Sequence, residues 1–192
     1  MILWTMQPRY ILDLVQTTGV YICDPERTTM PEFTKQYDWL AERMTEKVGP
    51  PPAGVRYPVW AWYKQRGKHK KPDLRSERWC YGPGDEDYVC MELDVPDEFV
   101  VLSDFDIWHI VLCDSLISDT EEEDKQQDAY WDSLSEAEKA IYKSKNWERV
   151  FITTPMHNDW TKRGELVQAT FWELKAEYIQ RIYPFRTAKA KH

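Results

Sequence analysis

The stretch YVCMELDV, residues 88–95, alternates between two kinds of side chain. Its odd-numbered residues, from Val89 to Val95, are all apolar, while the even-numbered residues include Glu92 and Asp94. Successive side chains of an extended chain point to opposite faces, so this pattern predicts a β-strand that is buried on one face and open on the other. The rest of the fold can be worked out from this strand.

Further strands and helices follow on both sides of it. We expect strands at 2–6, 20–23, 57–63, 99–102, 167–174 and 178–185, with a helix at 173–182 as the alternative for the last part of the chain. We expect helices at 9–17, 31–48, 105–112 and 135–142. Ser103 or Asp104 can cap the third helix, and Ser135 with Glu138 forms a capping box for the fourth. The acidic segment TEEEDKQQD, 120–128, is expected to be exposed and mobile.

These elements predict one compact α+β domain over residues 1–187, with a mixed or antiparallel sheet and flanking helices. The basic tail at 188–192 is expected to be frayed. The apolar runs are too short for a membrane helix, and the N-terminus lacks the features of a signal peptide. The four cysteines have no C-x-x-C spacing, which is typical of reduced thiols and favours the cytoplasm.

Charge is distributed unevenly along the chain. The formal net charge is −8, yet residues 79–124 contain fifteen Asp and Glu and no Lys or Arg, which leaves +7 on the rest. Residues 64–78 contain seven Lys and Arg. Two interpretations stay open: this basic segment neutralises the acidic one within the fold, or it faces a ligand.

Aromatic residues are the second unusual feature. Ten tryptophans span the chain, and the segment YPVWAWY, 57–63, carries two of them immediately before the basic segment. Core packing explains most of these rings, while a pocket that stacks a flat ring is the alternative for two or three. Near the end of the chain, Gln168 and Glu173 lie among apolar neighbours in VQATFWEL. They are either solvent-facing residues of a strand or polar groups aimed into an aromatic cleft, where a nicotinamide ring could stack.

The sequence contains none of the common catalytic motifs. It has no glycine-rich phosphate loop, no G-x-S-x-G and no H-E-x-x-H. The segment DFDIWH offers Asp104, Asp106 and His109, but residues two apart on a helix point to different faces. We therefore interpret it as a helix cap with surface residues and predict no metal site.

Several segments together resemble a known bacterial family. LWTMQ (3–7), GPPPAGVRYPVWAWY (49–63), KKPDLR (70–75), VLSDFDIWH (101–109) and QATFWELK (168–175) are similar to the domain of unknown function 3841, over residues 1 to about 187. That family implies no established activity. The opening strand, helix and Gly-aromatic step also resemble, more loosely, ADP-ribosyltransferase-like domains.

The looser resemblance implies an enzyme that uses NAD on a macromolecular acceptor, either protein or nucleic acid. Those domains usually carry His or Arg in the first strand, where this chain has Trp4 and Thr5. By the resemblance, Glu173 would be catalytic with Gln168 assisting, and Arg75 would hold phosphate. The nicotinamide pocket would be lined by Trp4, Thr5, Tyr57, Trp62 and Tyr63. This hypothesis places Trp4, Trp62 and Glu173 on one cleft.

Two other functions remain open. The basic segment and the aromatic strand could bind RNA or single-stranded nucleic acid by charge and stacking, without catalysis. The acidic region 79–124 could instead bind a basic protein partner.

Overall fold

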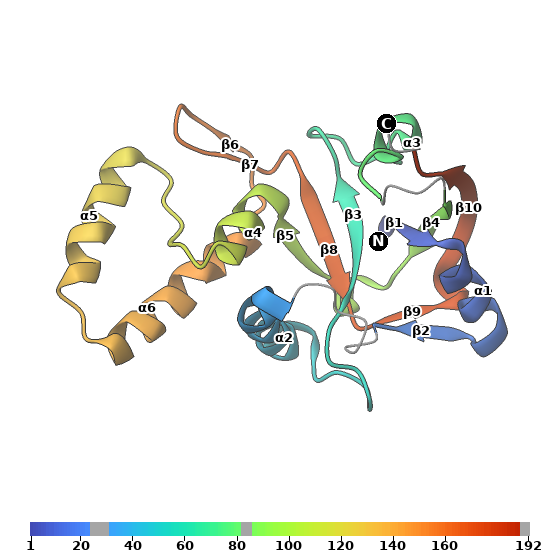
Figure 1. Ribbon diagram of the computed structural model, residues 1–192, viewed down its shortest axis with the longest axis horizontal. Helices are drawn as coiled ribbons and strands as arrows, with labels where there is room; N and C mark the ends of the chain where they lie inside the picture. The colour runs from blue at the N-terminus through green and yellow to red at the C-terminus, as the bar shows by residue number, and fades with distance from the viewer. Residues whose placement is uncertain (24–30, 82–85, 189–192) are drawn as a thin grey trace.

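The computed structural model describes residues 1–23, 31–81 and 86–188. Six strands form the main sheet in the order β10-β4-β1-β3-β8-β5, and every pairing within it is antiparallel. Figure 1 shows this sheet beside a pair of helices that extends away from it. The main-sheet strands are β1 (Ile2–Pro8), β3 (Val59–Lys64), β4 (Asp87–Asp94), β5 (Val101–Asp104), β8 (Val167–Phe171) and β10 (Ile179–Arg186).

Two short pairs of strands accompany the main sheet: β2 (Val20–Ile22) with β9 (Glu173–Lys175), and β6 (Met156–His157) with β7 (Lys162–Arg163). The helices are α1 (Arg9–Thr18), α2 (Thr34–Val48), α3 (Leu74–Glu77), α4 (Phe105–Leu112), α5 (Glu121–Asp132) and α6 (Glu136–Trp147). The α+β architecture expected from the sequence is confirmed, and the sheet is antiparallel.

The alternation in β4 divides the molecule into two layers. Val89, Met91 and Leu93 are fully buried against α1 and the β2–β9 pair, in a cluster with Leu3, Ile11 and Leu174. We call this side of the sheet the α1 face. The side that carries Trp4, Trp60 and Trp62 is called the tryptophan face.

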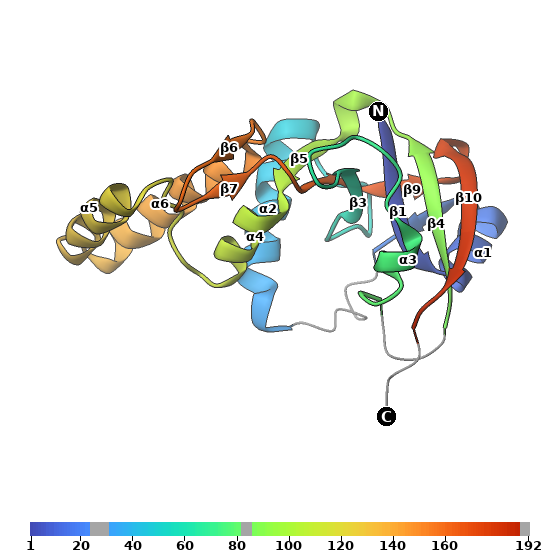
Figure 2. The same ribbon diagram turned by 90° about the horizontal axis from the view of Figure 1, so that it is seen from above.

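Two separate parts of the chain cover the tryptophan face. At the β5–β8 end, α2 and α4 pack on it through Leu40, Ile107, Trp108 and Val111. At the β1–β4–β10 end, Leu74 and Tyr81, from the segment that follows β3, pack on Trp4, Met6 and Cys90. Figure 2 shows α2 and α4 on one side and α3 on the other. The middle of the face lies between these two covers.

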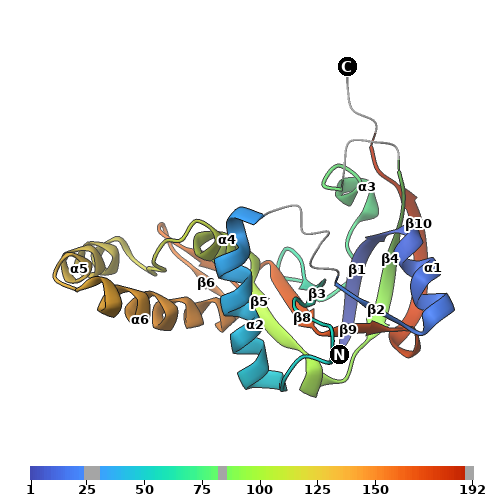
Figure 3. The same ribbon diagram turned by 60° about the horizontal axis from the view of Figure 1, so that its bottom comes forward.

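The acidic segment at 120–128 forms the N-cap and the first turns of α5, a helix that was not among those expected from the sequence. Thr120 caps α5 by accepting a hydrogen bond from the N–H of Glu123, and four acidic residues lie in the first turn, where the helix dipole favours negative charge. Together, α5 and α6 form an arm that lies beyond α2 and α4 from the sheet (Figure 3). Arg149 secures its base through ion pairs to Asp119 and Glu123.

The end of the chain also differs in detail from expectation. The expected strand at 167–174 is divided at Trp172 into β8 of the main sheet and β9, which pairs with β2. The alternative helix at 173–182 is wrong, because β9 is followed by a single 3-10 turn and then by β10. Ala188 is buried and donates its N–H to the carbonyl of Arg78, so the fold includes this first residue of the expected tail. Residues 189–192 lie outside the described part of the chain.

Candidate functional site

One row of side chains crosses the whole tryptophan face. Residues that pair directly across neighbouring antiparallel strands point to the same face, and the register links Ser103, Gln168, Trp62, Trp4, Glu92 and Arg181 in this order. Trp62 and Trp4 occupy the middle of this row. The pairing therefore places Trp4, Trp62 and Gln168 side by side on one face. These are three of the residues that the sequence proposes for the site.

A pocket of about 390 Å³ lies beside the row at Gln168, between α2, α4, β3 and β8. We call it the aromatic pocket. Its polar lining residues include Gln168 from the sheet, His109 from α4 and Cys113, which follows the last residue of α4. Its rings come from Phe33, Tyr37, Trp60, Phe105 and Trp108.

The rings of this pocket hold one another in place. Tyr37 makes edge contacts with Trp60 and Trp108, and the centroids of Trp60 and Trp108 are 5.5 Å apart. Burial, with a smaller contribution from Cys23, raises the pKa of Tyr37, so its hydroxyl stays neutral. A wall of interlocked rings is already organised to stack a flat ligand, because little side-chain freedom remains to be lost on binding.

The position of α4 depends on a buried carboxylate at its N-terminus. Asp104 is fully buried, and its side chain accepts hydrogen bonds from the N–H groups of Ile107 and Gly164. It thus joins the start of α4 to the loop that precedes β8. This arrangement places Phe105 at the pocket, where its ring centroid is 5.1 Å from that of Trp62.

The aromatic surface continues from Trp62 toward the basic loop, which we define as residues 64–78. Trp62 is paired with Trp4, whose ring makes an edge contact with His69 of the loop. His69 also contacts the ring of Tyr63, and its Nε2 lies 2.8 Å from the carbonyl oxygen of Ile2. The basic loop is therefore held against the same face as the aromatic pocket.

The charges of this loop do not neutralise the acidic region in the part of the chain that the structure describes. There, no ion pair joins a Lys or Arg of residues 64–78 to a carboxylate of residues 86–106, although Arg66 lies near Glu77 within the loop. Lys64 and Lys71 donate to backbone carbonyls, and Lys71 also lies over the ring of Tyr183. Arg66, Lys68 and Lys70 are exposed. The described ion pairs therefore do not support the interpretation in which the basic segment neutralises the acidic one within the fold.

Three proposed ligand-binding residues have structural partners instead. Thr5 is buried and donates its hydroxyl to the carbonyl of Trp60, which links β1 to β3. Tyr57 lies outside the aromatic pocket and donates to Asp38, which also pairs with Arg56. Arg75 forms a two-pronged ion pair with Asp73, and its hydrogen bonds lower the pKa of that carboxyl to about 2. A phosphate would have to compete with Asp73 for this guanidinium.

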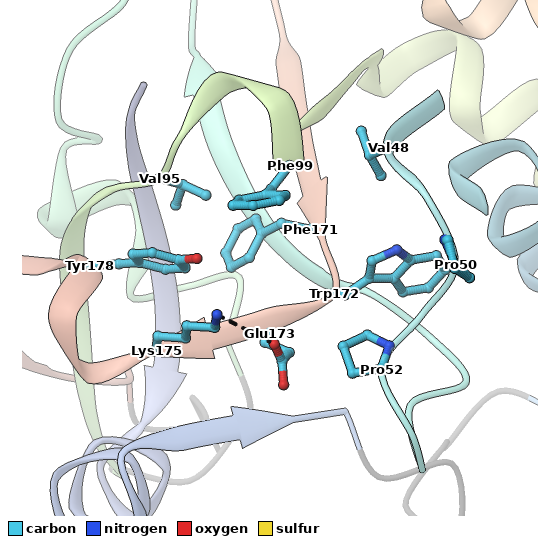
Figure 4. Close-up of a pocket in the computed structure, with 10 residues that line it drawn as sticks. All are labelled: Val48, Pro50, Pro52, Val95, Phe99, Phe171, Trp172, Glu173, Lys175 and Tyr178. Atoms are coloured by element: carbon cyan, nitrogen blue, oxygen red, sulfur yellow. Dashed lines mark ion pairs between the residues drawn. The ribbon is translucent and has the colours of Figure 1, made fainter. Parts of the chain in front are cut away.

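Glu173 lies apart from the other proposed site residues. It belongs to β9 and lines a second pocket, of about 140 Å³, whose lining includes none of Trp4, Trp62 and Gln168. Figure 4 shows it below Phe171, with the ammonium of Lys175 directed toward its carboxylate. The structure thus brings Trp4, Trp62 and Gln168 together on one face and does not bring Glu173 to them.

Sequence reasoning did not select the rings that form the aromatic pocket. Most of the wall is formed by Trp60, Phe105, Trp108 and Tyr37. The residues proposed from β3 are instead Trp62 and Tyr63, which lie on the same strand as Trp60. The period-two alternation of β3 shows that Trp60 and Trp62 share a face, so Trp60 could have been included. The contributions of Tyr37 and Trp108 depend on how α2 and α4 pack, for which the sequence has no local signal.

Some kinds of site are not found in the described residues. Within 1–23, 31–81 and 86–188, no group of three or more His, Cys, Asp or Glu is arranged to hold a metal ion. Asp104 is a helix cap there and Asp106 is exposed, as the sequence predicted for this segment. No helix in the described part of the chain combines the length and the apolar character needed to cross a bilayer.

Comparison with known proteins places the chain in a family. The model of the family "Domain of unknown function (DUF3841)" matches residues 2–180. Since this match covers most of the chain, the protein belongs to the DUF3841 family. Neither the curated proteins nor the solved structures contain a significant match.

Proposed function

We propose that the aromatic pocket binds the flat ring of a nucleotide and that the basic loop binds its phosphates. The observation that carries the proposal is that an aromatic pocket lies on the same face of the sheet as a loop whose exposed Lys68 and Lys70 form no ion pair with any described carboxylate. Stacking of a base on an aromatic side chain contributes about 1–3 kcal/mol, and lysine and arginine are the usual partners of phosphate.

NAD is the nucleotide that we infer. The volume of about 390 Å³ suits one ring with part of its sugar, while the row through Trp62 and Trp4 extends from the pocket toward the loop. Gln168 supplies both a donor and an acceptor at the pocket wall, which matches the carboxamide of nicotinamide or a ribose hydroxyl. A dinucleotide could therefore lie along the row with its pyrophosphate near the basic loop.

The reaction that we propose, from the resemblance to ADP-ribosyltransferases, is transfer of ADP-ribose to a protein or nucleic-acid acceptor. Cleavage of the nicotinamide bond develops positive charge on the ribose, and a nearby carboxylate stabilises that charge best. Glu173 lines a different pocket, so Gln168 is the proposed polar group next to the ring. A neutral carboxamide can orient the ribose and stabilise charge only through its dipole. The geometry therefore supports nucleotide binding more strongly than transfer.

The test is calorimetric titration of the protein with NAD, with nicotinamide release in cell extract measured in parallel. We expect binding that weakens about tenfold or more in Phe105→Ala, because a stacking ring is lost, and up to about tenfold in Gln168→Ala, because a hydrogen bond is lost. Trp160→Ala is the control, since this exposed tryptophan lies outside the pocket lining. Absence of NAD binding, or equal binding by all four proteins, would contradict the proposal.

Single-stranded nucleic acid is the second candidate ligand, and the exposed cations at Arg66, Lys68 and Lys70 favour it. Binding of this kind weakens steeply with salt, because each neutralised phosphate releases counterions. A double Lys68→Glu, Lys70→Glu variant should then lose affinity for single-stranded RNA and show a shallower salt dependence. Lys145→Glu, an exposed lysine on α6, is the matched control. RNA binding without NAD binding would select this candidate over the first.

A further inference from the structure

The pocket beside Glu173 has a lining unlike that of the aromatic pocket. Four aromatic side chains, Phe99, Phe171, Trp172 and Tyr178, line it together with Val48, Pro50, Pro52 and Val95 (Figure 4). Among the residues that the structure describes, no stacked or edge contact joins any two of these four rings, although most other rings of the protein pair closely. Phe171 and Tyr178 pack in the core of the α1 face and Trp172 packs in the core beneath α2 and α4, and parts of all four rings border the pocket. We call this arrangement the aromatic cage.

The charges at the cage are a carboxylate and a loosely held ammonium. Glu173 is about one-quarter exposed, and its carboxylate accepts no hydrogen bond from any described residue. Its ion partner is Lys175, whose Nζ lies 3.7 Å from Oε2 of Glu173 and 5.8 Å from the ring centroid of Tyr178. Lys175 is 38% exposed, so it can turn out into solvent. The chain's own ammonium therefore occupies the position in which a cation would interact with both the carboxylate and an aromatic ring.

Two features organise the cage before any ligand arrives. The indole N–H of Trp172 donates to the carbonyl of Gly49, which fixes one wall, and Pro50–Pro52 form a stiff second wall. Phe171 is almost fully buried, and Tyr178 is 7% exposed. Only Phe99, at 45% exposed, remains open to adjustment at the rim. A site with rigid walls loses little conformational entropy on binding.

We propose that the aromatic cage binds the head group of a quaternary alkylammonium compound, with Glu173 as the counter-ion. Aromatic faces attract cations, and recognition of choline and methylated lysine by several aromatic rings is the general use of that attraction. The volume of about 140 Å³ holds about five water molecules, so it suits a head group and not a nucleotide.

The small number of side-chain hydrogen-bond acceptors in the lining of the cage favours a quaternary over a primary ammonium. A primary ammonium has three N–H donors to satisfy, and apart from Glu173 the lining side chains offer only the hydroxyl of Tyr178 as an oxygen acceptor. A quaternary ammonium donates no hydrogen bonds, so entering the cage leaves none unsatisfied. This proposal is independent of the nucleotide site and gives Glu173 a binding role in place of a catalytic one.

The experiment compares choline with 3,3-dimethyl-1-butanol, its uncharged isostere, by ligand-observed NMR and calorimetric titration of the full chain. We expect choline to bind at least about tenfold more tightly, because only the charged head interacts with Glu173 and the ring faces. In Glu173→Gln this preference should fall several-fold but remain above unity, because the attraction of the ring faces for the charged head is unchanged. In Lys175→Ala choline should bind more tightly than in the wild type, because a competing ammonium has been removed.

Two further variants separate the cage from a general charge effect. Phe99→Ala should weaken choline binding, whereas Glu177→Gln, which removes an exposed carboxylate of the next turn, should leave it unchanged. A peptide with trimethyl-lysine, tested against the same peptide with lysine, distinguishes a protein-borne head group from a free one. Equal binding of choline and its isostere would overturn the proposal. The proposal would also be overturned if Lys175→Ala bound neither choline nor either of the two peptides.

Discussion

At the scale of single residues, burial decides which reactive groups are available. Cys90 lies on the tryptophan face beneath Leu74 and Tyr81 and is fully buried, and this burial raises its pKa to about 12. Cys113 is exposed and lines the aromatic pocket. Two thiols that the sequence does not distinguish therefore differ in their access to reagents in solution.

Alkylation of the native protein at pH 8 should reveal this difference. The thiolate is the reactive form, so we expect iodoacetamide to modify Cys113 readily and Cys90 only after denaturation. Peptide mass spectrometry gives the extent at each site. If NAD occupies the aromatic pocket, it should slow modification of Cys113 and leave that of the exposed Cys80 unchanged. Rapid native modification of Cys90 would show that the cover formed by residues 64–81 opens easily.

At the scale of elements, the cap of α4 couples a helix to a distant loop. Asp104 accepts hydrogen bonds from Ile107 and, at 2.6 Å, from Gly164. Gly164 has a φ of +77°, and a β-carbon there would lie 2.7 Å from Pro155, so only glycine fits this approach. The helix that carries Phe105 and Trp108 is positioned by this contact.

Replacing Asp104 by Ala should therefore destabilise the protein more than loss of an ordinary cap. We expect a decrease of about 2–4 kcal/mol in the free energy of unfolding, since one cap is lost and the buried N–H of Gly164 loses its partner. Ser135→Ala removes the exposed capping box of α6 and should cost only about 1 kcal/mol. Urea denaturation measures both. Equal losses would show that the bond to Gly164 contributes little.

At the scale of the whole molecule, the sheet and the arm differ in how firmly they are held. The central strands β1 and β4 are buried by residues from both faces, whereas Gln127 is the one residue of α5 that is buried. The base of the arm is secured by Arg149, and by Arg163 in an ion pair with Asp119. Its α6 helix ends in the buried Trp147. The packing contacts of the arm therefore become fewer with distance from its base, which lies at Asp119.

Native-state hydrogen exchange should follow this gradient. Local opening costs least where few apolar contacts must break, so the amides of α5 should exchange faster than those of β4 by about two orders of magnitude or more. The last turn of α6, which includes Asn146 and Trp147, should be protected and serves as the internal control. Uniform protection across the arm and the sheet would mean that the molecule opens only as one unit.

The sequence by itself determined the fold class of this protein and the positions of most strands of its main sheet. The alternation at 88–95, Gly19 after α1 and the box of Ser135 with Glu138 each act over a few neighbouring residues, so they can be recognised locally. It also indicated that aromatic rings and basic charge would lie together near residue 64. The acidic α5 was missed, because a run of charges lacks the apolar periodicity by which helices are recognised.

Only the tertiary structure decided which residues share a site. Strand order brings Trp4, Trp62 and Gln168 into one row, and the packing of α2 and α4 adds Tyr37 and Trp108 beside it. Glu173 was separated from them because the chain turns at Trp172 and leaves the main sheet to pair with β2. Pairing between distant strands depends on the hydrogen bonds and burial of the whole fold, and no local pattern in the sequence contains that information.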